Sequence, residues 1–133
     1  MAPHPSPYKS TGGFKRVANA VRYSMQGLVA ALRYESAFRQ ELLLAAVLTP
    51  AAFWVGQNTG QILLLIGSLV LVLIVELLNS AIEAVADAVS LDTNQLIGRA
   101  KDLGSAAVLL SIVLSLGIWL AALTEWARTY LTH

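Results

Sequence analysis

Two long uncharged stretches dominate the pattern of hydrophobic and polar positions along this chain. The first covers residues 42–75 and the second covers residues 103–124. A Gly-Gln-Asn-Thr-Gly segment at residues 56–60, made of turn-forming residue types, divides the first stretch in two. A helix needs roughly 15–20 residues to cross the hydrocarbon core of a bilayer. The pattern therefore predicts three membrane spans, at residues 41–56, 61–89 and 103–124.

These spans are predicted to be helical, because a backbone surrounded by lipid must satisfy all of its own hydrogen bonds. None of them alternates polar and apolar positions as a strand of a membrane barrel would. Pro50 lies inside the first span and has no backbone N–H to donate, so a kink is expected at residues 46–50.

Residues 14–40 mix apolar positions with basic ones, a pattern typical of an amphipathic helix at the membrane surface. We expect this helix to break near Gly27. Its basic face is expected to lie against anionic headgroups. The simpler alternative is a surface helix that only anchors the chain. Residues 1–13 contain three prolines and are expected to be a disordered tail, so residues 14–133 form one domain. His4 and His133, at the two ends, are expected to have no role. The predicted fold class is thus an all-α membrane protein, with three transmembrane helices after an N-terminal surface helix.

The composition agrees with a membrane protein. Hydrophobic residues make up 56% of the 133 positions and charged residues only 13%, more apolar surface than so small a chain can bury by itself. The net charge of +1 predicts no attraction to nucleic acid. Because cysteine is absent, any metal ion must be bound by oxygen or histidine.

Basic residues indicate how the spans are oriented. Six precede the first span, Arg99 and Lys101 lie between the second and third, and none lies in the first connecting loop. By the positive-inside rule, both basic regions face the cytoplasm. A polar substrate is therefore expected to be cytoplasmic.

The second span carries acidic residues toward its end, where residues 76–87 are ELLNSAIEAVAD. At about 100° per residue, Glu76, Glu83 and Asp87 fall on one face of a helix, with Asn79 beside them. We call these three carboxylates the acidic stripe. Each costs from ~2.5 to above 10 kcal/mol when placed within a membrane, so something must compensate for them.

Basic side chains or a divalent cation could provide this compensation. The segment GRAKDLGS at residues 98–105 lies on the same side of the membrane and carries Arg99, Lys101 and Asp102. Carboxylate ligands for a metal and cations for phosphates are what Mg-nucleotide chemistry requires. A further carboxylate could accept the proton of an attacking hydroxyl.

The chain has no P-loop, no protein-kinase glycine loop and no dinucleotide fingerprint, which excludes the standard soluble nucleotide-binding folds. The residues alone leave two main functions open. One is phosphoryl transfer to a lipid, and the other is a small proton-coupled or cation-coupled transporter subunit. A purely structural role is the third alternative.

The motifs ELLNSAIEAVAD and GRAKDLGSAAV together resemble the prokaryotic diacylglycerol kinase family. The resemblance starts near Gly13, includes Tyr23-Ser24 and the segment ESAFRQE at residues 35–41, and extends into the third span. It implies an ATP:1,2-diacylglycerol 3-phosphotransferase that makes phosphatidic acid and uses Mg²⁺. It also implies a homotrimer in the bacterial inner membrane, with active sites that face the cytoplasm and are shared between neighbouring subunits.

The same resemblance implies a role for each of several residues. Glu76 is expected to be the general base, and Asn79 to orient groups around the transferred phosphate. Mg²⁺ is expected on Glu35 and Glu83. The residues expected to contact the nucleotide are Arg16, Tyr23, Glu35, Glu83, Lys101 and Asp102. Those expected along the lipid substrate are Arg16, Glu41, Glu76 and Ser105.

Simpler interpretations stay open for some positions. Glu41, Arg39 and Arg99 could be interfacial charges that set helix depth, and Asp87 a charge at the membrane boundary. The aromatic side chains Phe53, Trp54 and Trp119 are expected to be interface or packing residues.

Two departures from the family pattern, Pro50 and Met25-Gln26, are expected to affect lipid and nucleotide affinity and to leave the reaction class unchanged. Undecaprenol kinase is the alternative within the same family. Asn79-Ser80 and Gly98-Arg99 favour the diacylglycerol branch.

Overall fold

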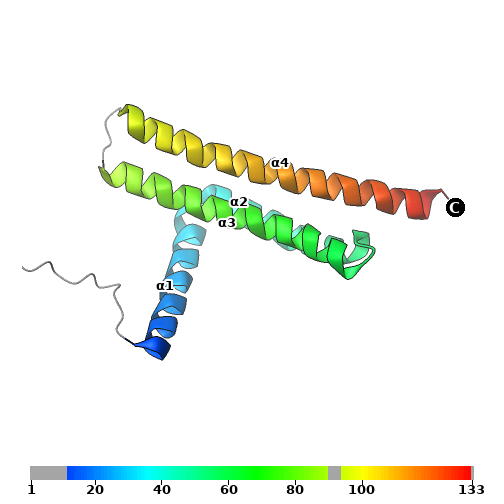
Figure 1. Cartoon of the computed structure of the whole chain (residues 1–133), viewed down its shortest axis with the longest axis horizontal. Coiled ribbons are helices and arrows are strands. Elements are labelled where there is room, and N and C mark those ends of the chain that lie inside the picture. The colour runs from blue at the N-terminus through cyan, green and yellow to red at the C-terminus, as the bar shows by residue number, and fades with distance from the viewer. Residues whose placement is uncertain (1–11, 90–93, 133) are drawn as a thin grey trace, which may run out of the picture. The chain divides into compact units, whose positions relative to one another are not determined.

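The computed structural model describes residues 12–89 and 94–132. Over these residues the chain forms four helices and no strand (Figure 1). They are α1 (Gly13–Tyr34), α2 (Ser36–Val55), α3 (Thr59–Val89) and α4 (Gln95–Leu131). The last three are long and apolar enough to cross a membrane. The predicted fold class is confirmed, whereas His4, His133 and most of the predicted tail lie outside the described residues.

The surface helix α1 belongs to a unit of its own, which ends at Tyr34, and the second unit begins at Glu35. α1 runs without interruption through Gly27, so the predicted break there was wrong. Nothing lies within 4 Å of the place where a Cβ of Gly27 would be, and one glycine in an open position costs a helix only about 1 kcal/mol. The helix ends at Tyr34 and not at residue 40, because Glu35 has an extended backbone.

The three membrane helices extend beyond the limits that the uncharged stretches predicted. α2 begins at Ser36 where residue 41 was expected, and α4 covers Gln95–Leu131 where residues 103–124 were expected. Charged residues mark the depth at which a helix leaves the hydrocarbon, but they do not end its backbone hydrogen bonding. α2 also continues through Pro50, where the Thr49 hydroxyl donates to the Ala45 carbonyl at 2.6 Å. The kink expected there stays a prediction.

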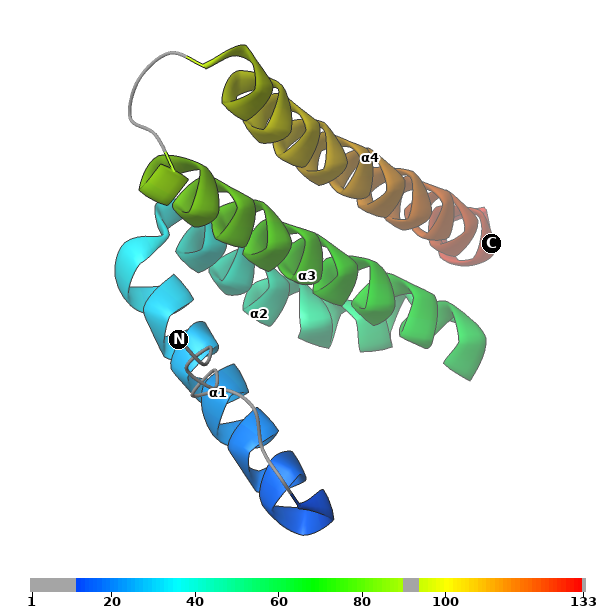
Figure 2. The same ribbon diagram turned by 60° about the vertical axis from the view of Figure 1, so that its left-hand side comes forward.

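Helix α3 is the central element of the second unit, since it packs against both α2 and α4 (Figure 2). The three helices meet in a cluster of buried side chains, in which Leu65 is fully buried. The other members are Ala45, Ala52, Val55, Leu69, Trp119 and Ala122. The small residues in this list let helix backbones approach closely, which is how helices associate in a membrane.

Polar contacts hold α3 and α4 in one register. In the middle of the pair, the hydroxyls of Ser68 and Ser115 lie 3.0 Å apart and both residues are buried. At one end, the Gln61 amide donates to the Glu125 carboxylate at 2.6 Å, and the Gln57 amide donates to the Thr129 hydroxyl at 3.1 Å. The α2–α3 turn is thereby tied to the end of α4.

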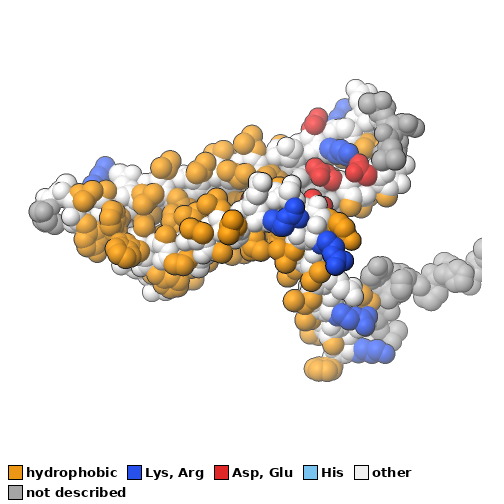
Figure 3. Space-filling view, turned by 180° about the vertical axis from the view of Figure 1, so that it is seen from behind, with side chains coloured by type: hydrophobic (Ala, Val, Ile, Leu, Met, Phe, Trp, Pro, Cys, Tyr) orange, Lys and Arg blue, Asp and Glu red, His pale blue; other side chains and the backbone are white. Residues whose placement is uncertain are grey.

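Hydrophobic side chains cover most of the outer surface of the three long helices on the face shown in Figure 3, while acidic side chains gather at one end of them. Leu43, Leu64, Val70 and Leu110 are among the exposed apolar residues. Such a surface suits contact with lipid, and so does the aromatic side chain of Trp54, which is also exposed.

The contrast between Leu65 and its neighbour Leu64 gives a matched test of the core. Leu65→Ala removes a fully buried side chain and is expected to lower the free energy of unfolding in detergent micelles by about 2–4 kcal/mol, because a cavity remains. Leu64→Ala makes the same chemical change on an exposed side chain and is expected to cost far less. Denaturant unfolding followed by circular dichroism measures both. An equal loss in the two variants would contradict the packing described here.

Candidate functional site

Helix α3 places the beginning of the acidic stripe on its packed face. The buried residues of this helix recur every three or four positions, and Glu76 and Asn79 continue that series. They are 6% and 9% exposed, whereas Glu83 and Asp87 are exposed at the end of the helix. The stripe therefore runs from the protein interior toward its surface.

Three other carboxylates lie near Glu76. The charges of Glu83, on the same helix, and of Glu35 act on Glu76, and the charge of Glu76 acts on Glu41. Glu35 and Glu41 come from the beginning of the neighbouring helix α2. We call Glu35, Glu41, Glu76 and Glu83 the acidic cluster. Glu41 and Glu76 lie within helices that can span a membrane, where like charges repel strongly.

Glu35 joins this cluster because of its backbone. Its φ of −109° and ψ of 105° are extended, and it occupies the N-cap position of α2. Side chains at that position commonly accept hydrogen bonds from the first turn, but the Glu35 carboxylate makes no capping hydrogen bond. The carboxylate is thus not used to cap the start of α2.

The second charged motif meets the stripe at its exposed end. Lys101 Nζ lies 2.6 Å from Asp87 Oδ1, and its charge also acts on Glu83. The lysine and aspartate side chains are 41% and 54% exposed, so this ion pair contributes little to stability. Lys101, one of the cations considered from the sequence, therefore contacts the acidic stripe.

Other predicted site residues are not brought together in this way. Asp102 and Ser105 are exposed on α4, and Arg99 is exposed one turn earlier. Arg16 and Tyr23 lie on α1, in the other unit, where the Arg22 guanidinium stands 5.3 Å from the centre of the Tyr23 ring. The nucleotide and lipid roles expected of these residues stay predictions.

The oxygen donors of the cluster fit a magnesium ion in kind. Mg²⁺ is commonly bound by one or two carboxylates, with water and substrate phosphates completing its coordination. Glu35 and Glu83 both lie close enough to Glu76 to interact with it and could supply that pair. Among residues 12–89 and 94–132, no group of three or more acidic or histidine side chains is placed to hold a metal ion.

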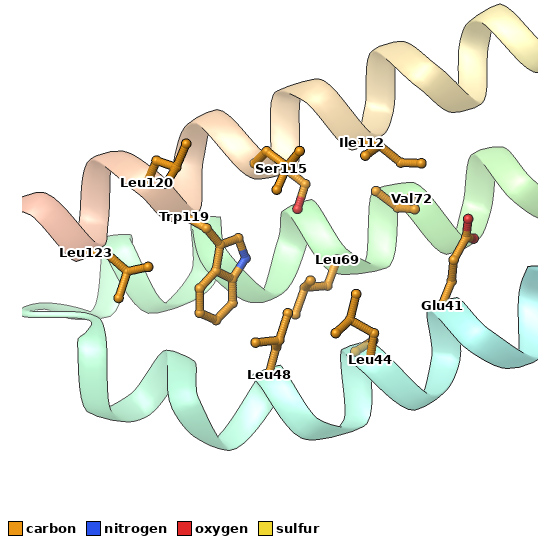
Figure 4. A pocket seen from close by; sticks show the side chains of 12 residues that line it. Glu41, Leu44, Leu48, Leu69, Val72, Ile112, Ser115, Trp119, Leu120 and Leu123 are labelled. Carbon is orange, nitrogen blue, oxygen red and sulfur yellow. The ribbon is translucent and has the colours of Figure 1, made fainter.

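An apolar cavity of ≈ 320 Å³ adjoins the cluster between α2, α3 and α4 (Figure 4). Glu41 lies at one end of it, and one of its carboxylate oxygens is buried without a hydrogen-bond partner. The walls are mainly aliphatic, with Leu48 on α2, Leu69 on α3 and Leu120 on α4. Trp119 also lines the cavity, and its indole N–H has no partner.

The cavity and the glycine at position 104 were not found from the sequence. Trp119 was expected to be an interface or packing residue, and its burial confirms packing. Gly104 is buried against Asn79, a contact that only the pairing of α3 with α4 creates. The small residues Gly104, Ser111 and Ser115, all on the buried face of α4, were the signal that could have indicated close packing.

The family model of prokaryotic diacylglycerol kinase matches residues 22–123, which include the acidic cluster and the segment at 98–105. The chain belongs to the prokaryotic diacylglycerol kinase family. Curated members named diacylglycerol kinase match most of it. The protein from Pseudomonas aeruginosa is 49% identical over 86% of this chain and 94% of its own length.

The family is also represented by the diacylglycerol kinase of Escherichia coli, 46% identical over 83% of this chain and 90% of its own length. That of Haemophilus influenzae is 43% identical over 84% of this chain and 94% of its own length. The expected resemblance to the diacylglycerol kinase family is confirmed. The predicted enzyme class, a kinase with transmembrane helices, is confirmed as well. Arg16 lies before the matched residues and Tyr23 within them.

The repulsion within the cluster leads to a prediction for stability. Glu41→Gln removes one charge from a half-buried carboxyl group beside Glu76, so it is expected to raise the free energy of unfolding, by up to about 1 kcal/mol because solvent screens the partly exposed group. Glu125→Gln is the control, because Glu125 lies at the other end of α4 and a glutamine there can still accept from Gln61. Unfolding in micelles at neutral pH measures both variants. A loss of stability in Glu41→Gln would show that this charge is compensated.

Proposed function

We propose that this chain transfers the γ-phosphoryl group of ATP to the primary hydroxyl of 1,2-diacylglycerol and so makes phosphatidic acid. The observation that carries the proposal is the position of Glu76, a buried carboxylate at the centre of an acidic cluster in a member of this family. A membrane helix retains such a group only at a high cost, which function explains better than packing does.

Glu76 is the general base in this proposal. The lipid hydroxyl oxygen attacks the γ-phosphorus, the bond from that phosphorus to the β–γ bridging oxygen breaks, and ADP leaves. Glu76 accepts the hydroxyl proton as the new bond forms. Asn79 lies one turn further along the same packed face of α3, where its amide can orient the reacting groups.

Glu35 and Glu83 would hold the magnesium ion that accompanies ATP. When bound, the ion neutralises negative charge on the phosphates during transfer. The carboxylates of the cluster repel one another, and a divalent cation between two of them would relieve that repulsion. This repulsion supports the assignment of Glu35 and Glu83 to the metal.

Lys101 would contact the phosphates, since a lysine ammonium is a compact cation suited to them. Its exposed ion pair with Asp87 is weak enough to be exchanged for a phosphate. Asp102 on α4, and Arg16 and Tyr23 on α1, complete the proposed nucleotide contacts. The basic residues at 1–40 and at 98–105 would place this site at the cytoplasmic face of a bacterial inner membrane.

The lipid would approach from the membrane side of the cluster. The apolar cavity can accept hydrocarbon, and Glu41, which lines it, interacts with Glu76, the residue that would receive the proton of the glycerol hydroxyl. Ser105 and Arg16 would add headgroup contacts. We further propose a homotrimer in which neighbouring subunits share sites. The exposed apolar side chains of α3, such as Ile74 and Leu78, can support this helix association.

Undecaprenol remains the alternative lipid substrate, and turnover of both lipids side by side distinguishes the two. The relatives reported above are all named diacylglycerol kinase, which favours diacylglycerol. A proton-coupled transporter subunit, also open from the residues alone, gains no support from these comparisons.

The central test combines a lipid panel with one substitution. Wild-type protein in mixed micelles with Mg²⁺ and radiolabelled ATP is expected to label diacylglycerol faster than undecaprenol. Glu76→Gln is expected to lower the rate by about 10²- to 10⁴-fold and to leave ATP binding detectable, because glutamine cannot accept the proton. Glu125→Gln is expected to behave like wild type. Absence of labelled lipid with wild-type protein in every detergent would refute the proposal.

The metal role gives a separate prediction. Glu83→Gln is expected to raise the Mg²⁺ concentration for half-maximal rate by on the order of 10- to 100-fold, because one charged oxygen ligand is lost. Titration of Mg²⁺ at saturating ATP measures this shift, with Glu125→Gln as the control. An unchanged Mg²⁺ requirement would remove Glu83 from the metal site.

A further inference from the structure

Helices α3 and α4 pack closely beside the proposed catalytic centre. Gly104 is buried on α4 and faces Asn79 of α3. A Cβ atom added to Gly104 would overlap the side-chain amide oxygen of Asn79, and it would lie 3.4 Å from the amide carbon. It would also come within 3.7 Å of Ile82 Cδ1. The amide thus occupies the space that any other residue at position 104 would fill.

Among the other glycines of α3 and α4, Gly60 alone has a neighbour: a Cβ there would lie 3.2 Å from the side-chain oxygen of Asn58, in the turn just before α3. Nothing lies within 4 Å of a Cβ built on Gly67, Gly98 or Gly117. Glycine is common in membrane helices for many reasons, and those three positions could accept a methyl group. Among these glycines, a contact from one helix to the other is therefore specific to Gly104 and is not a general consequence of glycine content.

The position of this contact links the two charged motifs. Asn79 lies one turn after Glu76 on the packed face of α3, and Gly104 lies one turn after Lys101 on α4. Ser68 lies 11 residues before Asn79 and Ser115 lies 11 residues after Gly104, about three helical turns in each helix. Their hydroxyls meet at 3.0 Å, so the two helices keep the same antiparallel register over this length. Toward the exposed end of the pair, Lys101 of α4 forms an ion pair with Asp87 of α3.

The Asn79 side chain is enclosed at this contact. Asn79 is 9% exposed, and its amide oxygen is buried without a hydrogen-bond partner. The orientation of the Asn79 amide therefore depends mainly on how it packs between α3 and α4. The space above Gly104 is what permits that orientation.

We propose that Gly104 is a positioning residue, whose missing side chain lets the Asn79 amide lie between α3 and α4 beside Glu76. Gly104 itself touches no substrate. The inference rests on the proposed function, because it assigns to Gly104 an effect on catalysis that acts through Asn79. A misplacement of about 1 Å in a catalytic group can lower a rate by about 100-fold, so one methyl group is sufficient.

The first measurement compares Gly104→Ala with Gly117→Ala in the full chain, in mixed micelles with diacylglycerol and Mg-ATP. Gly104→Ala is expected to lower kcat by about 10- to 100-fold while KM for both substrates changes by less than about 3-fold, because binding groups stay in place. Gly117→Ala makes the same change on the same helix in open space and is expected to keep wild-type kinetics. Full activity of Gly104→Ala, or an equal loss in Gly117→Ala, would overturn the inference.

The second measurement is a double-mutant cycle with Asn79→Ala, which removes the amide that the new methyl group would meet. If Gly104 acts through Asn79, the double variant is expected to have the activity of Asn79→Ala alone. An unfolding-temperature cycle is measured in parallel, and Gly104→Ala is expected to destabilise the wild type but not the Asn79→Ala protein. Where the activity of Asn79→Ala is too low to measure, the unfolding temperatures decide.

The outcomes separate this inference from the function beneath it. Equal losses from Gly104→Ala in the presence and absence of Asn79 would show that the glycine acts independently, and would overturn the inference while leaving the kinase proposal intact. Full activity of Asn79→Ala would instead remove Asn79 from the proposed mechanism. Failure of the wild type to phosphorylate any lipid would remove the proposed function itself.

Discussion

A charged carboxylate is poorly tolerated in hydrocarbon, and the arrangement of the second unit follows from how this chain accommodates several of them. Glu76 lies on the face of α3 that packs against protein, so lipid does not reach it. Glu83 and Asp87 lie further along, where the helix is exposed, and Lys101 of α4 pairs with Asp87. Neighbouring helices thus shield Glu76 from lipid, while an ion pair with Lys101 partly neutralises the charge of Asp87.

The same constraint explains why α3 is the central helix. Carboxylates of the acidic cluster come from α2 and α3, while α4 provides the cation and the small residues that allow close approach. Packing in a membrane depends on shape and on a few hydrogen bonds, because lipid tails are as apolar as the side chains. The serine pair in the middle and the glutamine contacts at the far end keep the register that brings Lys101 to the stripe.

Much of the fold was predictable, but the limits of its elements were not. The uncharged stretches and the turn at residues 56–60 correctly indicated three long apolar helices after an amphipathic one. The break expected at Gly27 was wrong, and the real break lies at Glu35, whose extended backbone no local pattern indicated. Hydrophobicity indicates where lipid can surround a helix, whereas helix ends depend on backbone hydrogen bonds that continue into polar segments.

The sequence by itself determined which residues share the face of α3, because helical periodicity alone brings Glu76, Asn79 and Glu83 together. It also determined that these groups need partners, since hydrocarbon does not solvate charge. Only the tertiary structure decided which groups surround them. These are the like charges of Glu35 and Glu41 at the start of α2, the cation of Lys101 from α4, and the backbone of Gly104 against the Asn79 amide. These contacts depend on the rotation and register of one helix against another. Both are set by the shapes of side chains across the interface, which produce no periodic pattern in the sequence.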